Sequence, residues 1–197
     1  MHIVFYGPEG SGKGTQAKLL SQKLKLPLIT FGDLVRDAAK NDQGMVGDAA
    51  RYALLEGRYL ANSEAFVLWK KRLKETDAQK GWIIDGFPRT IEQARFLTDK
   101  IEKYGYALDF VIYLFISEKE TLSRLSKRQR KLFAGSNINH DEPERIKKRL
   151  ADYKKNEKEI INYFTKMGVL LKINGEDTVE NIHQKILQKL NISSSSL

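Results

Sequence analysis

The chain has 197 residues, a length that fits one compact α/β domain and makes a second domain unnecessary. It contains no cysteine, which excludes disulfide scaffolds, thiolate-bound zinc and cysteine nucleophiles, and its three histidines show no metal-ligand spacing. Lysine and arginine number 34 against 25 aspartate and glutamate residues. The formal charge of +9 predicts an anionic partner but does not distinguish nucleic acid, a membrane surface and small phosphates.

The N-terminal region predicts a strand, a glycine-rich loop and a helix in that order. Residues 2–6 are a short apolar run, residues 15–25 repeat apolar residues at helical spacing, and the sequence GPEGSGKGT lies between them at 7–15. The first residues carry no basic leader, no long apolar stretch and no cleavage signal. We therefore expect a cytoplasmic protein.

The position of the glycine-rich loop is the one that a phosphate-binding P-loop requires. Glycines let consecutive backbone N–H groups point inward around a phosphate, the following helix N-terminus adds positive potential, and Lys13 can reach the outer phosphates. An ordinary glycine turn would explain neither this lysine nor the hydroxyl of Thr15. We expect nucleotide binding, with ATP held by Gly10, Ser11, Gly12, Lys13, Gly14 and Thr15.

The part of the chain that follows predicts one short strand and three helices. The strand candidate is 28–30, and the helices are 32–40, 45–56 and a segment to about Glu75 that Asn62 or Ser63 can cap.

Two apolar runs predict the next strands. Trp82-Ile83-Ile84 stops abruptly at Asp85-Gly86, and residues 110–116 are apolar throughout, as in a strand that is covered on both faces. Thr90 and Gln93 predict a capping box for the helix after the first of these strands.

The C-terminal part completes an alternating pattern. Basic helical segments flank a loop near 133–139, and a strand at 169–173 precedes a helix at 178–190. Strands that alternate with helices predict an α/β fold with a parallel sheet of about five strands and helices on both faces. Because the site of such a fold lies at the carboxyl ends of the strands, the loops after Tyr6, Ile84 and Ile116 matter most.

Several motifs occur in order along the chain. They are Gly14-Thr15-Gln16 after Lys13, Gly32-Asp33-Leu34-Val35-Arg36, Asp85-Gly86-Phe87-Pro88-Arg89-Thr90 with Gln93, Arg124 with Arg128, Lys147-Lys148-Arg149-Leu150, and Asn174-Gly175. This series resembles the adenylate kinase family in its short-lid form, and its Asp-Gly-Phe-Pro-Arg stretch is far more specific to that group than the P-loop. One departure is Pro8-Glu9, because relatives usually carry the proline one place later.

The resemblance implies a P-loop NTPase-type fold in a single kinase domain. It assigns a core to 1–30, 76–130 and 142–192, a helical NMP-binding segment to 31–75, a short lid to 131–141 and a disordered tail to 193–197. The implied protein is a cytoplasmic monomer that reversibly transfers the γ-phosphoryl of ATP to AMP and yields two ADP. Mg²⁺ is the implied cofactor, and neither nucleic acid nor a membrane is an expected partner.

The charged residues of these motifs suit phosphoryl transfer. Asp85, with Asp33, would order Mg²⁺ through water, and the planar guanidinium groups of Arg36 and Arg89 would clamp the monophosphate. Arginines spaced four apart, at 124 and 128 and again at 145 and 149, predict two basic ridges that stabilise the transferring phosphoryl without a nucleophilic side chain. The expected catalytic residues are Lys13, Arg89, Arg124, Arg128, Asp141 and Arg149.

The acceptor base is predicted from Gln93, whose amide offers one donor and one acceptor to the edge of adenine. The alternative interpretation of Gln93 is a simple helix cap. The resemblance adds Arg124, Gly175 and Asp177 to the ATP site. For the AMP site it implies Phe31, Arg36, Arg58, Tyr59, Leu60, Gly86, Phe87, Pro88, Arg89, Gln93 and Arg149.

Departures from the family pattern leave alternatives open. Phe31 replaces a threonine beside the acceptor base and allows a UMP/CMP kinase or a broad-specificity kinase. A lid arginine and paired aspartates are usual where this chain has Ile138, His140 and Asp141, and Arg130 could substitute for the arginine. The loss of the lid arginine allows a second alternative, a low-activity nucleotide-binding regulator. The positive charge allows a nucleic-acid-stimulated ATPase, although no aromatic interleaving supports one.

Overall fold

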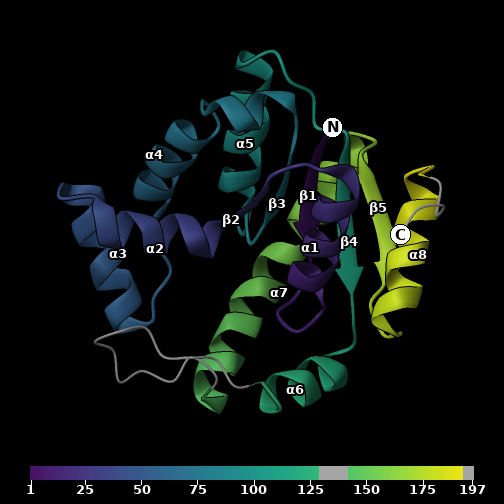
Figure 1. Cartoon of the computed structure of the whole chain (residues 1–197). Coiled ribbons are helices and arrows are strands. Elements are labelled where there is room, and N and C mark those ends of the chain that lie inside the picture. The colour runs from purple at the N-terminus through teal and green to yellow at the C-terminus, as the bar shows by residue number, and fades with distance from the viewer. Residues whose placement is uncertain (129–141, 193–197) are drawn as a thin grey trace.

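A five-stranded parallel sheet forms the centre of the computed structural model, which describes residues 1–128 and 142–192 (Figure 1). The strands are β1 (His2–Tyr6), β2 (Leu28–Thr30), β3 (Trp82–Asp85), β4 (Phe110–Phe115) and β5 (Leu170–Asn174). Their order is β2-β3-β1-β4-β5, and every neighbouring pair is parallel. This arrangement confirms the predicted α/β class and the predicted number of strands.

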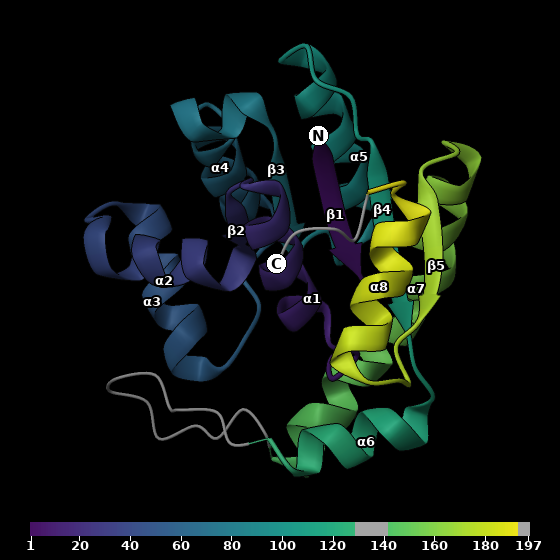
Figure 2. The same cartoon turned by 45° about the vertical axis from the view of Figure 1, so that its right-hand side comes forward.

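Helices cover both faces of the sheet. The helices α1 (Lys13–Leu24) and α8 (Val179–Lys189) lie on one face, and α5 (Ile91–Lys103) and α7 (Pro143–Lys166) lie on the other (Figures 1 and 2). The helix α6 (Glu118–Ser126) follows β4 at the carboxyl end of the sheet. This layering confirms the predicted helices on both faces. It follows from the parallel strands, since the chain must return over a face of the sheet before it starts the next parallel strand.

Two apolar clusters hold these layers together. Val4 and Tyr6 of β1 belong to the cluster that contains Phe164 of α7, whereas Ile3 and Phe5 belong to the cluster with α1 and α8. The alternation follows from the two-residue period of a strand. Because both faces are covered, the strands are apolar in a continuous run.

A helical lobe lies beside the β2 edge of the sheet, within residues 31–75. It contains α2 (Phe31–Asn41), α3 (Met45–Glu56) and α4 (Asn62–Arg72), and the short 3₁₀ helix η1 (Thr76–Lys80) leads from it back to β3 (Figures 1 and 2, left). The lobe carries five of the residues that the sequence assigns to the monophosphate: Phe31, Arg36, Arg58, Tyr59 and Leu60.

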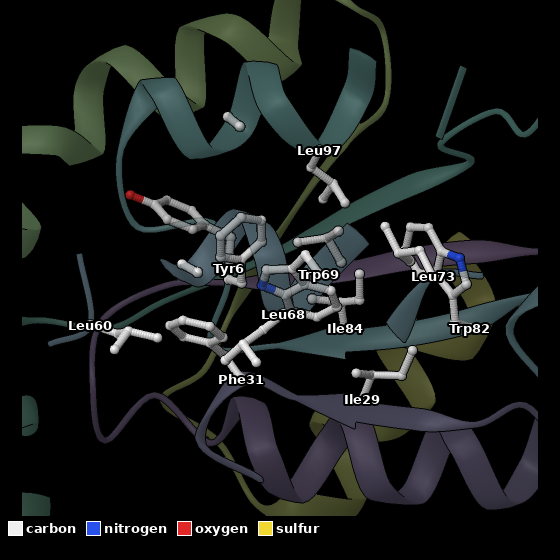
Figure 3. Close-up of a cluster of buried hydrophobic side chains, with 14 of the residues drawn as sticks. Tyr6, Ile29, Phe31, Leu60, Leu68, Trp69, Leu73, Trp82, Ile84 and Leu97 are labelled. Atoms are coloured by element: carbon white, nitrogen blue, oxygen red, sulfur yellow. The ribbon is translucent and has the colours of Figure 1, made fainter. Parts of the chain in front are cut away.

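An aromatic cluster anchors this lobe to the sheet. The ring centre of Phe31 lies 6.1 Å from that of Trp69 and 5.6 Å from that of Phe87, and all three side chains are buried. Figure 3 shows Phe31 and Trp69 together in the same cluster as Tyr6 and Ile84. Phe31 is therefore a core residue of the junction between the lobe and the sheet.

The structure corrects three local predictions. Ala61, and not Asn62 or Ser63, precedes the helix α4, which ends at Arg72 instead of Glu75. The helix α6 ends at Ser126, so Arg128 does not share a helical face with Arg124. The predicted capping box at the start of α5 is half formed. The predicted lid at 131–141 and tail at 193–197 fall wholly outside the described residues.

The N-terminus of α5 shows the half-formed capping box. The Thr90 hydroxyl accepts a hydrogen bond from the Gln93 backbone N–H at 3.3 Å, as predicted. The Gln93 side chain does not return to Thr90 but accepts the backbone N–H of Arg89 at 2.8 Å. The amide of Gln93 thereby fixes the residue that precedes the cap.

In the two described stretches, no helix is both long enough and apolar enough to cross a membrane.

Candidate active site

A cleft of about 1020 Å³ opens at the carboxyl ends of the strands. The loops after β1 and β3 line it, together with residues of α6 and α7. This is the edge at which ligands bind in open α/β sheets. The cleft brings together Lys13, Asp85, Arg89, Arg124, Arg128 and Arg149.

The glycine-rich loop adopts a conformation that depends on glycine. Gly7 has φ 141°, and a Cβ there would lie 2.2 Å from the carbonyl oxygen of Leu114. Gly12 is left-handed, with φ 90°, and directly precedes α1. The first turn of α1 contains no acidic residue, so its N-terminus keeps the positive potential that attracts phosphate.

Lys13 is held inside this loop. Its Nζ donates a hydrogen bond to the Pro8 carbonyl oxygen at 2.7 Å. Burial lowers the pKa of Lys13, and the negative charges of Asp85 and Glu9 oppose that effect. The loop thus presents a partly buried cation, which interacts more strongly with a phosphate than a fully solvated one would.

Asp85 ends β3 beside the P-loop. Its Oδ1 is buried and has no hydrogen-bond partner in the described part of the chain, while its Oδ2 would lie 3.3 Å from a Cβ at Gly14. A buried carboxylate oxygen without a partner fits a cation or an ordered water. No group of three or more acidic or histidine side chains among residues 1–128 and 142–192 could hold a metal.

Arg89 lies over two aromatic rings. Its guanidinium is 3.9 Å from the ring centre of Tyr59 and 5.7 Å from that of Phe31, and its Nε donates to the Gly86 carbonyl oxygen at 2.9 Å. The sequence placed both Arg89 and Tyr59 at the monophosphate, and the structure brings them together. The stacked guanidinium keeps a planar fork available for an anion.

Arg149 reaches the cleft from α7 and meets the P-loop. Its Nη2 lies 3.1 Å from Oε2 of Glu9, and the Arg149 side chain is only 11% exposed. Oε1 of Glu9 accepts a hydrogen bond from the Tyr59 hydroxyl at 3.3 Å. Sequence reasoning treated Glu9 only as a departure from the family pattern. The one available signal was a carboxylate inside a phosphate-binding loop.

Arg124 joins the P-loop to the C-terminal part of the chain. Its Nη1 donates to the Gly10 carbonyl oxygen at 3.2 Å, its Nη2 to the Gly175 carbonyl oxygen at 2.9 Å, and its Nε to Glu120 at 2.6 Å. Gly175 has no room for a side chain, because a Cβ would lie 2.9 Å from the Ser11 carbonyl oxygen. The predicted ATP-site residues Arg124 and Gly175 therefore lie against the P-loop.

Arg36, predicted to clamp the monophosphate, and Asp33, predicted to order Mg²⁺ with Asp85, pair with each other instead of entering the cleft. Arg36 Nη2 lies 2.5 Å from Asp33 Oδ1, and their side chains are 54% and 66% exposed. Asp33 also accepts a hydrogen bond from the Thr30 hydroxyl. Burial would raise the pKa of Asp33, but the bonds from Thr30 and Arg36 hold it below its ordinary value.

The remaining predicted residues lie in α5, in the lobe, just before α8 and outside the described residues. Gln93 is buried, and its Nε2 donates to Oδ1 of Asn62 at 2.8 Å. Arg58 lies over the Tyr52 ring at 5.9 Å, and Leu60 is buried. Asp177 precedes α8 and pairs with Lys185 at 2.7 Å, which with Asn181 and Thr178 lowers its pKa to about 2. Four residues lie outside the described residues: Arg130, Ile138, His140 and Asp141.

Comparisons with known proteins agree with this geometry. A sequence model described as adenylate kinase matches residues 5–169. The chain is 35% identical over 188 residues to an adenylate kinase of Leptospira biflexa, and the match covers 95% of this chain and 98% of the relative. It is 34% identical over 184 residues to adenylate kinase 1 of Nostoc sp., with 93% and 95% covered. It is 30% identical over 211 residues to an adenylate kinase of Archaeoglobus fulgidus, with 94% and 96% covered.

The family match and the cleft describe the same part of the chain. The matched residues include the P-loop lysine, the carboxylate that ends β3 and the arginines of the cleft, on a parallel sheet of the expected class. The chain belongs to the adenylate kinase family and is a phosphotransferase.

Proposed function

We propose that this protein reversibly transfers the γ-phosphoryl of Mg-ATP to AMP in the cleft described above. The observation that carries the proposal is the convergence of Lys13, Arg89 and Arg149 on one cleft with the buried carboxylate of Asp85. Family membership supports the choice of ATP and AMP as substrates.

The P-loop side of the cleft would hold ATP. Backbone N–H groups of the loop and the N-terminus of α1 would bind the phosphates, and Lys13 would leave the Pro8 carbonyl to reach the outer ones. Asp85 would hold Mg²⁺ through water, and the metal would supply charge neutralisation between the outer phosphates. Arg124 would hold the P-loop in position through its hydrogen bonds to the carbonyl oxygens of Gly10 and Gly175.

The opposite side of the cleft would hold AMP. Arg89 and Arg149 would bind its phosphate, with the Tyr59 ring keeping the Arg89 guanidinium in place. Arg36 would join them if the helical lobe (residues 31–75) closes, which requires the exposed pair of Arg36 and Asp33 to separate. Closure would also exclude water, which otherwise competes as the phosphoryl acceptor.

Catalysis would then rest on position and charge. The guanidinium groups and the ammonium group of the cleft would stabilise the charge on the equatorial oxygens of the transferring phosphoryl. No side chain needs to form a covalent intermediate, because the AMP phosphate oxygen attacks directly. We also propose that the protein works as a monomer in the cytosol.

A second candidate function is the phosphorylation of further nucleoside monophosphates besides AMP. The observation that favours it is that Gln93 already bonds the Arg89 backbone and Asn62, while Phe31 is packed in the core. A side chain whose amide groups are already hydrogen-bonded inside the protein discriminates among nucleotide bases less strongly.

A coupled assay of ATP with AMP, UMP, CMP and GMP, each with and without Mg²⁺, tests the proposal. We expect turnover with AMP that requires Mg²⁺. Comparable turnover with several monophosphates would support the second candidate. Failure to phosphorylate any of the four would contradict both candidates.

A further inference from the structure

Glu9 connects three parts of the protein at the mouth of the P-loop. Its Oε2 lies 3.1 Å from Arg149 of α7, and its Oε1 accepts a hydrogen bond from Tyr59 of the helical lobe. The guanidinium of Arg89 in turn lies over the Tyr59 ring, 3.9 Å from the ring centre. One carboxylate of the phosphate-binding loop therefore contacts both the helix that bears a proposed phosphate ligand and the helical lobe.

The contact between Glu9 and Arg149 has an unusual geometry. Nη2 and Oε2 are close enough for an ion pair, yet Nη2 and Nε of Arg149 are buried and make no hydrogen bond with any described residue. A buried guanidinium without an anion nearby is costly, so the carboxylate stabilises Arg149 in place. Because the ion pair leaves Nη2 and Nε without a hydrogen bond, a phosphate that approaches from the cleft would satisfy these donors better than the carboxylate does.

A phosphate is such an anion, and its binding would change the balance at this contact. It carries more charge than a carboxylate and offers acceptors in the geometry that a guanidinium fork prefers. Once a phosphate lies on Arg149, the negative charge of Glu9 beside it becomes unfavourable. The two anions compete for one cation.

We propose that Glu9 is a positioning residue that occupies Arg149 in the empty cleft and is displaced from it by the phosphate of the incoming monophosphate. The proposal rests on the proposed function, because Arg149 must be a ligand of that phosphate. Glu9 then has two effects. It holds Arg149 and Tyr59 ready before binding, and it weakens the affinity for AMP because its contact must be lost.

The test is calorimetric titration of AMP, without ATP or Mg²⁺, into the full chain. Glu9→Gln keeps the size of the side chain and an acceptor for Tyr59 but removes the charge. We expect it to bind AMP about tenfold more tightly, which corresponds to about 1.4 kcal/mol. In steady-state assays KM for AMP should fall by a similar factor with a much smaller change in kcat, since Glu9 leaves Arg149 before the transfer. A residue needed only to hold Arg149 in place would give the opposite result, weaker binding of AMP.

Two controls isolate the phosphate and the charge. Adenosine lacks the phosphate, so Glu9→Gln should leave its affinity unchanged. Glu159→Gln removes the same charge from an exposed position that also borders the cleft, and it should not change the affinity for AMP. If Glu159→Gln tightened AMP binding as much as Glu9→Gln, the loss of any negative charge near the cleft would explain the effect, and the proposal would be wrong.

A double-mutant cycle tests whether Glu9 acts through Arg149. Arg149→Ala should weaken AMP binding, and adding Glu9→Gln to it should give no gain. If Arg149→Ala leaves AMP binding unchanged, the proposed role of Arg149 fails. If Arg149→Ala weakens binding but Glu9→Gln does not tighten it, only the present proposal fails. Should Glu9→Gln have a lowered Tm, Glu9→Ala serves as the second variant, and it too must tighten AMP binding.

Discussion

The guanidinium of Arg89 lies 3.9 Å from the centre of the Tyr59 ring, so the loop after β3 and the helical lobe meet in a cation–π contact. We expect Tyr59→Leu to raise KM for AMP about fivefold, because such a contact is worth about 1 kcal/mol. Tyr59→Phe keeps the ring and should retain most of the AMP affinity. The coupled assay with varied AMP distinguishes them, and equal effects of the two substitutions would argue against the stacking role.

Lys13 is the cation that the P-loop encloses. Lys13→Ala should reduce kcat by at least about a hundredfold, because it removes a charge-assisted contact to the transferring phosphoryl. The Tm should change little. Lys18→Ala, on the exposed side of the same helix, is the matched control and should leave kcat unchanged. Near-normal turnover by Lys13→Ala would contradict the assignment of the site.

Asp85 supplies the buried oxygen that fits a metal-bound water. Asp85→Asn should raise the Mg²⁺ concentration needed for half-maximal rate by about tenfold or more, because outer-shell partners typically contribute that much to metal affinity. EDTA should abolish activity of the unmodified protein. Asp99→Asn, at an exposed position of α5, should leave the Mg²⁺ dependence as it is. An unchanged dependence in Asp85→Asn would remove this residue from the proposed metal site.

Gln93 could act on the base or on Arg89, and the two roles predict different kinetics. We expect Gln93→Ala to lower the ratio of kcat/KM for AMP over CMP by about tenfold, the factor that about 1.4 kcal/mol implies. Asn62→Ala removes only the acceptor of the Gln93 Nε2, leaves the bond to the Arg89 backbone and should preserve the ratio. If Gln93→Ala slows AMP and CMP equally, Gln93 positions Arg89 and does not read the base.

Phe31 is buried between Trp69 and Phe87, which makes it a test of stability. Phe31→Ala should reduce the free energy of unfolding by about 3–5 kcal/mol through loss of apolar contact and creation of a cavity. Tyr52→Ala, an aromatic truncation at a 57% exposed position of the same lobe, should change it by less than about 0.5 kcal/mol. Urea unfolding monitored by circular dichroism gives both values. A small effect at Phe31 would mean that its ring is not part of the core.

The sequence predicted the fold because its local signals agree with each other. Continuous apolar runs gave β1, β3 and β4, and the glycine-rich loop and Asp85 marked the carboxyl edge of the sheet. What sequence reasoning could not give was the partner of each charged side chain. The contact of Glu9 with Arg149 depends on side-chain directions that spacing does not encode. The three-residue spacing of Asp33 and Arg36 allows their pair but does not exclude a direction toward the cleft.

Gln93 and Arg128 show the same limit at the level of local structure. A capping box assigns the Gln93 side chain to its own helix cap, but packing against α4 offers Asn62 as a partner and the Arg89 backbone lies within reach. A spacing of four places Arg128 on the face of Arg124 only while the helix continues, and α6 ends at Ser126. Periodicity predicts which residues share a helix face, whereas helix ends depend on tertiary contacts.

The bonds of Arg124 to Gly10 and Gly175 tie the first loop of the chain to its last strand and helix. Gln16 adds to this link, because its Nε2 donates to the Val179 carbonyl oxygen at 2.8 Å. A chain that is still being synthesised has made its P-loop long before residues 170–192 leave the ribosome. The nucleotide site of the nascent protein therefore lacks its C-terminal support until translation is almost complete, and a message truncated near its 3′ end yields a chain that contains the whole motif without the scaffold that shapes it.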